Sequence, residues 1–174
     1  MILIVSVRIK LKLNITKVAN VILYMLEKKV LHLNDKKLSV LLFLIDYNHF
    51  INFEEKVFGE SYIKRNRNPE PKTLSNIFSV MINNDDLDED DERLYIIQEL
   101  LDHLDIEILD KSKYTELNYI KMEEEFDKDL FTKNELKIIS EIVELYKNET
   151  SRKMANICFG IDKVRETIKD EVIL

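Results

Sequence analysis

The pattern of apolar and polar residues divides this chain of 174 residues into a short alternating segment and a long helical part. Residues 5–13, VSVRIKLKL, alternate strictly between apolar and polar side chains, which predicts a strand with one buried face. From residue 15 onward, apolar residues recur mainly at spacings of three and four, which is typical of helices packed on a core. We therefore expect a strand or extension over residues 1–14 and a helical domain over residues 15–174.

The segment from about residue 35 to residue 50 is predicted to be the central helix. Its apolar residues form two stripes, the first at Leu38, Leu41, Leu42 and Ile45 and the second at Val40, Phe43, Leu44 and Tyr47. A helix that is apolar on two sides packs against other elements on both, so the core should be built around this segment.

The same spacing predicts further helices, and two other segments indicate short strands. Helices are expected at about 16–30, 72–83, 92–102, 150–160 and 162–169. A further helix is expected to begin at the capping box of Thr132 and Glu135 and to extend through Tyr146. Alternation predicts a hairpin of 104–109 with 116–123, and a short hairpin or extended loop around Gly59. The predicted fold class is mainly α within α+β, a single helical domain with a small β-element from residues 5–13, 57–63 or 104–123.

The distribution of charge adds a connector to this picture. The net charge is −7, and residues 85–92, DDLDEDDE, contain seven acidic residues and no basic one. Residues 1–84 contain 13 basic and 7 acidic residues, whereas residues 93–174 contain 13 basic and 19 acidic residues. Because seven neighbouring acids repel one another and hold water, we predict a solvated acidic connector over residues 85–92.

Composition argues against several structural classes. Two glycines and two prolines are too few for the many tight turns of an all-β fold. The single cysteine, Cys158, excludes an internal disulfide and a cysteine-based zinc site, and it fits a reducing, cytoplasmic setting. Since neither a signal-peptide pattern nor an apolar run of membrane-spanning length is present, we expect a soluble protein without a membrane partner.

The motifs also argue against catalysis. The sequence has no nucleophile–base arrangement and no glycine-rich phosphate loop, so we expect no enzyme activity, no cofactor and no small-molecule substrate. Asp46 and His49 lie one helical turn apart, and we interpret them as a structural hydrogen-bonded pair because a metal site would need more ligands.

Both prolines lie in one stretch, YIKRNRNPEPKTL, residues 62–74. Prolines fix the backbone, so they predict a rigid, extended entry to the helix at 72–83 that presents basic side chains in a defined geometry. The candidate partner-binding residues are Lys64, Arg65, Arg67, Asn68, Pro69 and Pro71. The alternative interpretation is an ordinary turn with solvated charge.

Three motifs, in this order, resemble the SocA-like Panacea domain, a family that also occurs among phage-associated proteins. They are KLSVLLFLIDYNHF, FGESYIKRNRNPEPKTL and DLFTKNELKIISEIVELYKNETSRKM, and the resemblance covers roughly residues 15–158. The structural motif positions that it assigns are Leu41, Leu42, Asp46, His49, Gly59 and Tyr62. Asn68 stands where the family favours glycine, and because asparagine tolerates a left-handed backbone, we expect the turn to survive.

The resemblance implies a function. Members of this family often act as antitoxins that bind and neutralise a toxin protein encoded by a neighbouring gene. We therefore expect a non-catalytic protein-binding module whose partner is such a toxin. The alternative is a nucleic-acid-binding regulatory protein of phage or mobile-element origin, because the first half of the chain is basic and some antitoxins bind their operator DNA.

Overall fold

The computed structural model describes residues 13–174, so the strand predicted over residues 5–13 lies outside the described residues except for its last position. The described part forms seven α-helices, one 3-10 helix and two hairpins. The elements before the acidic connector are α1 (Ile15–Glu27), α2 (Asp35–Phe53), β1 (Tyr62–Arg65), β2 (Asn68–Pro71) and α3 (Lys72–Asn83). Those after it are α4 (Glu92–His103), β3 (Leu104–Asp110), β4 (Thr115–Lys121), the 3-10 helix (Lys128–Leu130), α5 (Lys133–Tyr146), α6 (Ser151–Phe159) and α7 (Asp162–Glu166). The predicted class, mainly α within α+β in a single domain, is confirmed.

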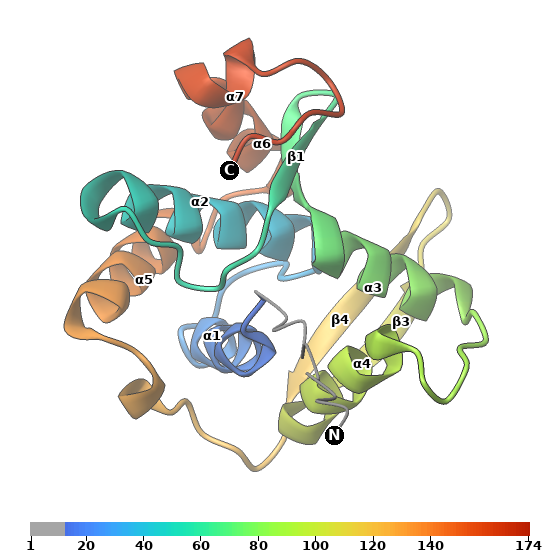
Figure 1. Cartoon of the computed structure of the whole chain (residues 1–174). Coiled ribbons are helices and arrows are strands. Elements are labelled where there is room, and N and C mark those ends of the chain that lie inside the picture. The colour runs from blue at the N-terminus through green and yellow to red at the C-terminus, as the bar shows by residue number, and fades with distance from the viewer. Residues whose placement is uncertain (1–12) are drawn as a thin grey trace, which may run out of the picture.

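Helix α2 runs through the middle of the molecule (Figure 1), as its two apolar stripes predict. Leu38, Leu41, Leu42, Phe43 and Ile45 have no exposed surface. The helix packs against α3, α5 and α6, and against one strand of each hairpin. Helix α1 lies beneath it and packs against α4 and β4. The burial of its middle turns therefore makes α2 the element against which the other layers pack.

Polar side chains fix the ends of the helices. Asn14 and Asn34 cap α1 and α2, and the predicted capping box of Thr132 and Glu135 is present at α5. Lys37 is fully buried, and its ammonium group donates to the carbonyls of Leu31 and Lys147 at 2.6 and 2.8 Å. Desolvation lowers the pKa of Lys37, but the two carbonyls accept two of its three N–H donors, so the lysine ties the α1–α2 connection to the end of α5.

The two hairpins differ in how well the sequence predicted them. The hairpin of β3 and β4 pairs Leu104 with Lys121 through to Asp110 with Thr115, close to the predicted bounds. Of the β-element expected within residues 57–63, only the part from Tyr62 onward is a strand, and it pairs with a strand that contains both prolines. The residues before Tyr62 form a loop in which Gly59 has φ 73, a left-handed conformation that favours glycine.

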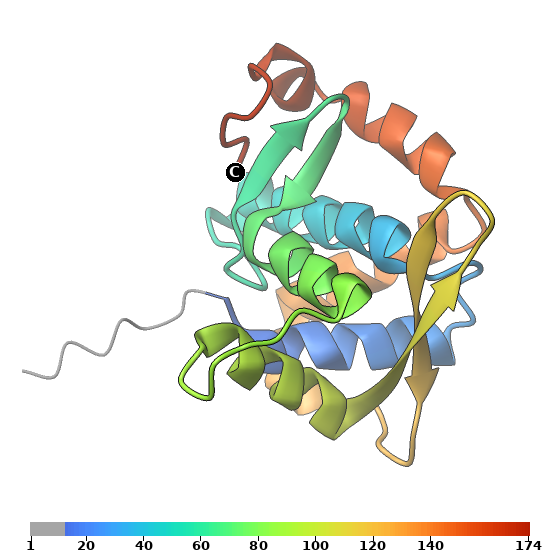
Figure 2. The same cartoon turned by 90° about the vertical axis from the view of Figure 1, so that its right-hand side faces the viewer.

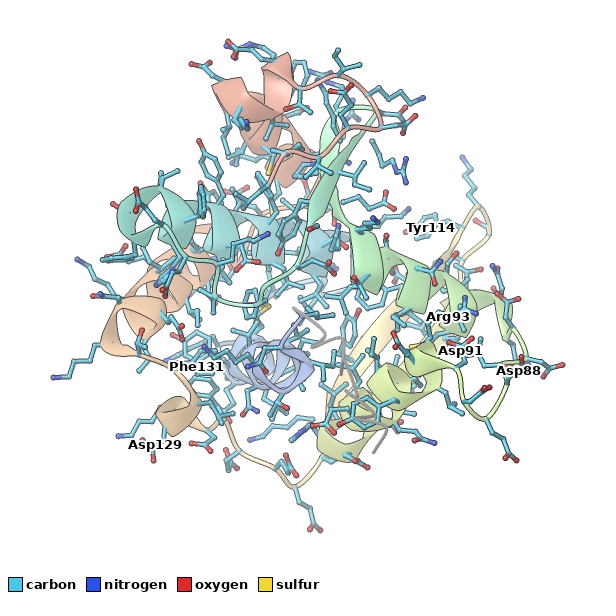
Figure 3. The ribbon with its side chains drawn as sticks, viewed as in Figure 1. Asp88, Asp91, Arg93, Tyr114, Asp129 and Phe131 are labelled. Atoms are coloured by element: carbon cyan, nitrogen blue, oxygen red, sulfur yellow. The ribbon has the colours of Figure 1, made fainter. Side chains whose placement is uncertain are left out.

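The acidic connector joins α3 to α4. Its residues up to Asp90 are mostly exposed, and it ends at Asp91, which caps α4 and pairs with Arg93. Figure 3 shows Asp88 at the outer edge of the connector and Asp91 beside Arg93 at the start of the helix. Hydrogen bonds from the Arg93 side chain hold the pKa of Asp91 at about 2. The predicted connector over residues 85–92 thus ends in a helix cap, with Glu92 already in α4.

None of the helices within residues 13–174 combines the length and the apolar character needed to cross a membrane.

Candidate functional site

A groove of about 750 Å³ opens between the β1–β2 hairpin, α2, α3 and α6. Four stretches of chain contribute to it, and they lie far apart in the sequence. Its apolar surface comes from Val40, Pro69, Phe78, Ile82 and Ala155, and its polar lining is rich in serine and asparagine. We call this feature the hairpin groove. It contains Arg67, Asn68 and Pro69, three of the six residues that the sequence predicted as a partner-binding loop.

The chain that leads into the hairpin is held by a buried carboxylate, Asp46 of α2. One oxygen of Asp46 accepts the N–H groups of Val57 and Phe58 at 2.6 and 2.9 Å, and the other accepts the hydroxyl of Tyr62 at 2.7 Å. Burial raises the pKa of Asp46 to about 6, although all three hydrogen bonds and nearby Lys56 favour the ionised form. Asp46 therefore fixes where the loop and β1 leave the core.

His49, one turn further along α2, does not hydrogen-bond Asp46, so the interpretation of these two residues as a mutual pair is corrected. Its Nδ1 lies 2.6 Å from the carbonyl oxygen of Glu55, and its ring packs on Phe53 at 4.8 Å between centroids. Each side chain instead holds a different part of the loop between α2 and β1, because that loop returns alongside the end of α2. Within residues 13–174, no cluster of three or more potential ligands could hold a metal ion.

A second buried carboxylate, Glu60, was missed by the sequence analysis. Its oxygens accept the N–H groups of Ser61, Thr73 and Leu74 at 2.9, 3.2 and 3.0 Å. Thr73 and Leu74 lie in the first turn of α3, whose N-cap is Pro71, a residue without a side-chain acceptor. Glu60 therefore caps α3 from a distance and binds the base of the hairpin to that helix. The signal in the sequence was a helix start that lacks its own capping residue.

The C-terminal segment, residues 168–174, covers the outer edge of β1. Tyr62 and Lys64 exchange backbone hydrogen bonds with this segment, and Ile63 forms a bridge with Val172. Lys64 is only 8% exposed, and its ammonium group donates to the carbonyls of Arg165 and Thr167 at 2.8 and 2.6 Å. Lys64 thus attaches the hairpin to the end of α7, and its charge is not presented on the surface.

Both prolines occupy positions where a backbone N–H would point away from β1. Pro71 pairs with Tyr62 and Pro69 pairs with Lys64, and the backbone groups of these two β1 residues point outward, to the C-terminal segment. Opposite residues in an antiparallel pair direct their backbone groups either toward each other or both away. The prolines therefore face the free edge of β2, where they cost no hydrogen bond to β1 and discourage addition of another strand.

The tip of the hairpin is a tight turn at Asn66 and Arg67. The left-handed residue is Asn66, with φ 37, and Asn68 lies in β2. The expectation that Asn68 replaces a left-handed glycine is therefore corrected, since the left-handed position lies two residues earlier. The guanidinium of Arg67 lies 4.4 Å from the centre of the Phe159 ring, so a cation–π contact joins the tip to the end of α6.

The charges around the hairpin groove are mixed. Lys36, Arg67 and Arg152 are exposed basic residues in its lining, and Asp35 and Glu70 are the acidic ones. One oxygen of Asp35 is occupied by the N–H of Leu117 at 3.0 Å. Lys36 lies 4.7 Å from the centre of the Tyr114 ring, which Figure 3 shows on the β3–β4 hairpin beyond α3. Arg65, which the sequence grouped with Arg67, instead pairs with Asp170 at 2.5 Å.

Cys158 is buried in α6, and burial raises the pKa of its thiol to about 12. The thiol therefore stays protonated at neutral pH and acts as a small packing residue.

Comparison with known proteins identifies the family. The sequence pattern described as "Antitoxin SocA-like, Panacea domain" matches residues 37–160, which is more than half of the chain. Searches among curated proteins and among solved structures returned no match. The matched range contains the hairpin groove except for Asp35 and Lys36, and it contains all six structural motif positions, of which Asp46, Gly59 and Tyr62 form the base of the hairpin. This chain belongs to the antitoxin SocA-like, Panacea domain family.

Proposed function

We propose that this chain is an antitoxin that neutralises a toxin protein by direct binding, and that the hairpin groove is its docking surface. The observation that carries the proposal is a groove of about 750 Å³ beneath a rigidly held hairpin, which lies almost entirely inside the range that matches the antitoxin-like family. Nothing in the proposal requires a catalytic step. Membership in the family supports the antitoxin role, and the geometry supports the position of the docking surface.

Rigidity is the first argument for this surface. The hairpin is fixed at its base by Asp46 and Glu60, along its length by Lys64, and at its tip by the contact of Arg67 with Phe159. A surface that is already ordered loses little conformational entropy when a partner binds, so more of the contact energy appears as affinity. The prolines contribute in the same way, because they restrict β2 before binding.

The chemistry of the lining is the second argument. Val40 and Phe78 lie at the base of the groove, each 4% exposed, and the serines and asparagines around them supply hydrogen-bonding groups. An apolar centre with a polar rim is the usual composition of a protein interface. Arginine is enriched in such interfaces, and here Arg67 and Arg152 lie on two sides of the groove.

The predicted loop residues divide into three roles under this proposal. Arg67, Asn68 and Pro69 are proposed to contact the partner, because they line the groove. Lys64 and Pro71 are both buried and are proposed to hold the hairpin in place. Arg65 remains exposed at 47% of its side chain and pairs with Asp170, so it is proposed as a peripheral residue.

Nucleic-acid binding has less support as an alternative. Several basic residues of the first half are engaged inside the protein: Lys37 and Lys64 are buried, and Lys17 pairs with Glu135 at 2.8 Å. Fewer basic side chains are therefore left to contact phosphates than the sequence suggested. Operator DNA stays a hypothesis, which a salt titration of DNA binding would test.

The functional test is co-expression with the product of the neighbouring gene. We expect that product to arrest growth alone, growth to resume when this chain is co-expressed, and the two proteins to copurify. A neighbouring product that is toxic but neither binds this chain nor is neutralised by it would overturn the proposal.

A further inference from the structure

The outer edge of β3 is unpaired in the part of the chain that the structure describes, where β3 pairs only with β4. The turn of this hairpin shows which residues face outward. Lys111 and Tyr114 form a hydrogen-bonded pair, with backbone hydrogen bonds of 2.8 and 3.3 Å in the two directions. Starting from this pair, hydrogen-bonded and non-hydrogen-bonded residue pairs alternate along β3 and β4. The residues of β3 whose backbone groups face the outer edge are therefore Leu104, Ile106, Ile108 and Asp110, and the N–H of Leu104 is already taken by the carbonyl of Leu100 at the end of α4.

Two hydrogen bonds agree with this assignment. Leu117, opposite Ile108, directs its N–H away from β3 and donates to Asp35. The outward N–H of Ile106 is satisfied by the side chain of Asp105 at 2.9 Å, which occupies the place of a neighbouring strand's carbonyl.

The two faces at this edge have opposite chemistry. Ile106 and Ile108 lie on the face that also carries the buried Leu117 and Tyr119, yet Ile108 is 47% exposed. Asp105 and Glu107 lie on the opposite, solvent face, and both are exposed. A strand placed beside β3 would therefore need apolar side chains on one face and basic side chains on the other.

Acidic residues on an edge strand can simply discourage pairing. The comparison with β2 argues against that explanation alone. The free edge of β2 is closed by two prolines, whereas β3 is seven residues long, contains no proline and leaves Ile108 half exposed on its apolar face. The molecule thus closes the edge of β2 with prolines and leaves open the part of the β3 edge around Ile108 and Asp110.

We propose that the edge of β3 binds residues 5–12 of a second copy of this chain as an added strand. The sequence VSVRIKLK alternates apolar residues with Ser6, Arg8, Lys10 and Lys12. Its apolar residues would continue the face of Ile106 and Ile108, and its basic residues would lie beside Asp105 and Glu107. The period of two, the length and the charge all match β3.

The position of the chain entry favours a second copy over the same chain. Figure 2 shows that α1 begins at the end of the molecule opposite to the β3–β4 hairpin, which crosses the other end of α1. Thirteen residues of helix span about 20 Å, which an extended chain covers with about six residues. If the same chain were to reach its own β3 edge, residues 7–12 would be needed to cover this distance. The basic residues would then lie in the connector and could not pair with β3 as a strand.

The test is the oligomeric state of the full-length protein, measured by sedimentation over a wide concentration range. We expect a reversible dimer. Ile108→Pro removes one outward N–H at a position where β4 loses no hydrogen bond, and should raise the dimer dissociation constant about tenfold or more. Ile108→Val, the matched control, keeps that N–H and should leave the constant nearly unchanged.

Charge reversal identifies the segment that occupies the edge. Arg8→Glu with Lys10→Glu and Lys12→Glu should weaken the dimer, and so should Asp105→Lys with Glu107→Lys. All five substitutions in one chain should restore it, because the reversed segment then meets a reversed edge. Thermal melts of each variant show that the monomer still folds. A wild-type protein that stays monomeric would overturn the proposal, and so would a dimer that is insensitive to Ile108→Pro. A variant with all five substitutions that does not regain dimer affinity would also overturn it.

Discussion

Replacement of Asp46 tests how the base of the hairpin is held. Asp46→Asn keeps the shape of the side chain: its carbonyl oxygen can still accept from Val57 and Phe58, and its amide can donate to the Tyr62 oxygen. Asp46→Ala removes all three contacts and leaves three buried donors without an acceptor. One buried unsatisfied group costs about 1–3 kcal/mol, so we expect the alanine variant to lose about 3 kcal/mol or more.

The asparagine variant should differ from wild type in its dependence on pH. The folded-state pKa of Asp46 is about 6 against an ordinary value of 3.8, so the folded protein holds this proton more tightly than the unfolded chain. The contribution of Asp46 to the free energy of unfolding is therefore greatest below the unfolded pKa and falls as pH rises through the folded one. The loss between about pH 4.5 and about pH 7.5 comes to about 2 kcal/mol.

Chemical denaturation of wild type and both variants across this pH range measures these effects. Stability of wild type minus that of Asp46→Asn should fall by about 2 kcal/mol as pH rises, because the other titrating groups cancel in the difference. A difference that does not change with pH would refute the assignment of a buried carboxylate whose desolvation outweighs its hydrogen bonds. An alanine variant as stable as the asparagine variant would refute the role of the three contacts.

Three further predictions concern other buried residues. Leu42→Asp should abolish cooperative folding, because it places an unpaired charge in the centre of α2, and circular dichroism melts would show this; a melt close to wild type would contradict the core assignment. Glu60→Ala should cost about 2 kcal/mol, because the first turn of α3 loses its acceptor, whereas Glu60→Gln should cost less; equal stability of the alanine variant and wild type in urea would exclude the capping role. Lys64→Met keeps the stem but removes the donors to Arg165 and Thr167, so amide hydrogens of residues 168–174 should exchange faster while those of α2 stay protected; unchanged exchange would show that Lys64 does not attach this segment.

The parts of the fold that follow from local rules could be predicted from the sequence. The double apolar stripe identified α2 as central, the T-x-x-E spacing identified the start of α5, and alternation located the β3–β4 hairpin. These signals lie within a few residues of one another in the chain. A pattern that extends over only a few residues indicates the secondary structure directly, because the spacing between residues determines which side chains share a face.

The first hairpin and the site required contacts between distant segments. Val57 and Phe58 looked like strand residues, but Asp46 holds their N–H groups and keeps them in a loop. Lys64 looked like a surface charge, but its acceptors lie about a hundred residues away, on the segment after α6. No periodicity shows such partners. The sequence therefore singled out the basic stretch, but the contacts of its individual lysine and arginine residues depended on the tertiary structure.

The central claim is that the hairpin groove binds the partner, and the most direct test is the affinity of the neighbouring gene product for groove variants, measured by calorimetry at low and high salt. Arg67→Glu should weaken binding about tenfold, more at low salt, and Ser79→Trp should weaken it further by filling the groove from α3. Lys137→Glu and Gln98→Trp, exposed controls on α5 and α4 outside the groove lining, should bind like wild type with melting temperatures unchanged. Wild-type affinity in both groove variants, or equal losses in the two controls, would contradict the claim.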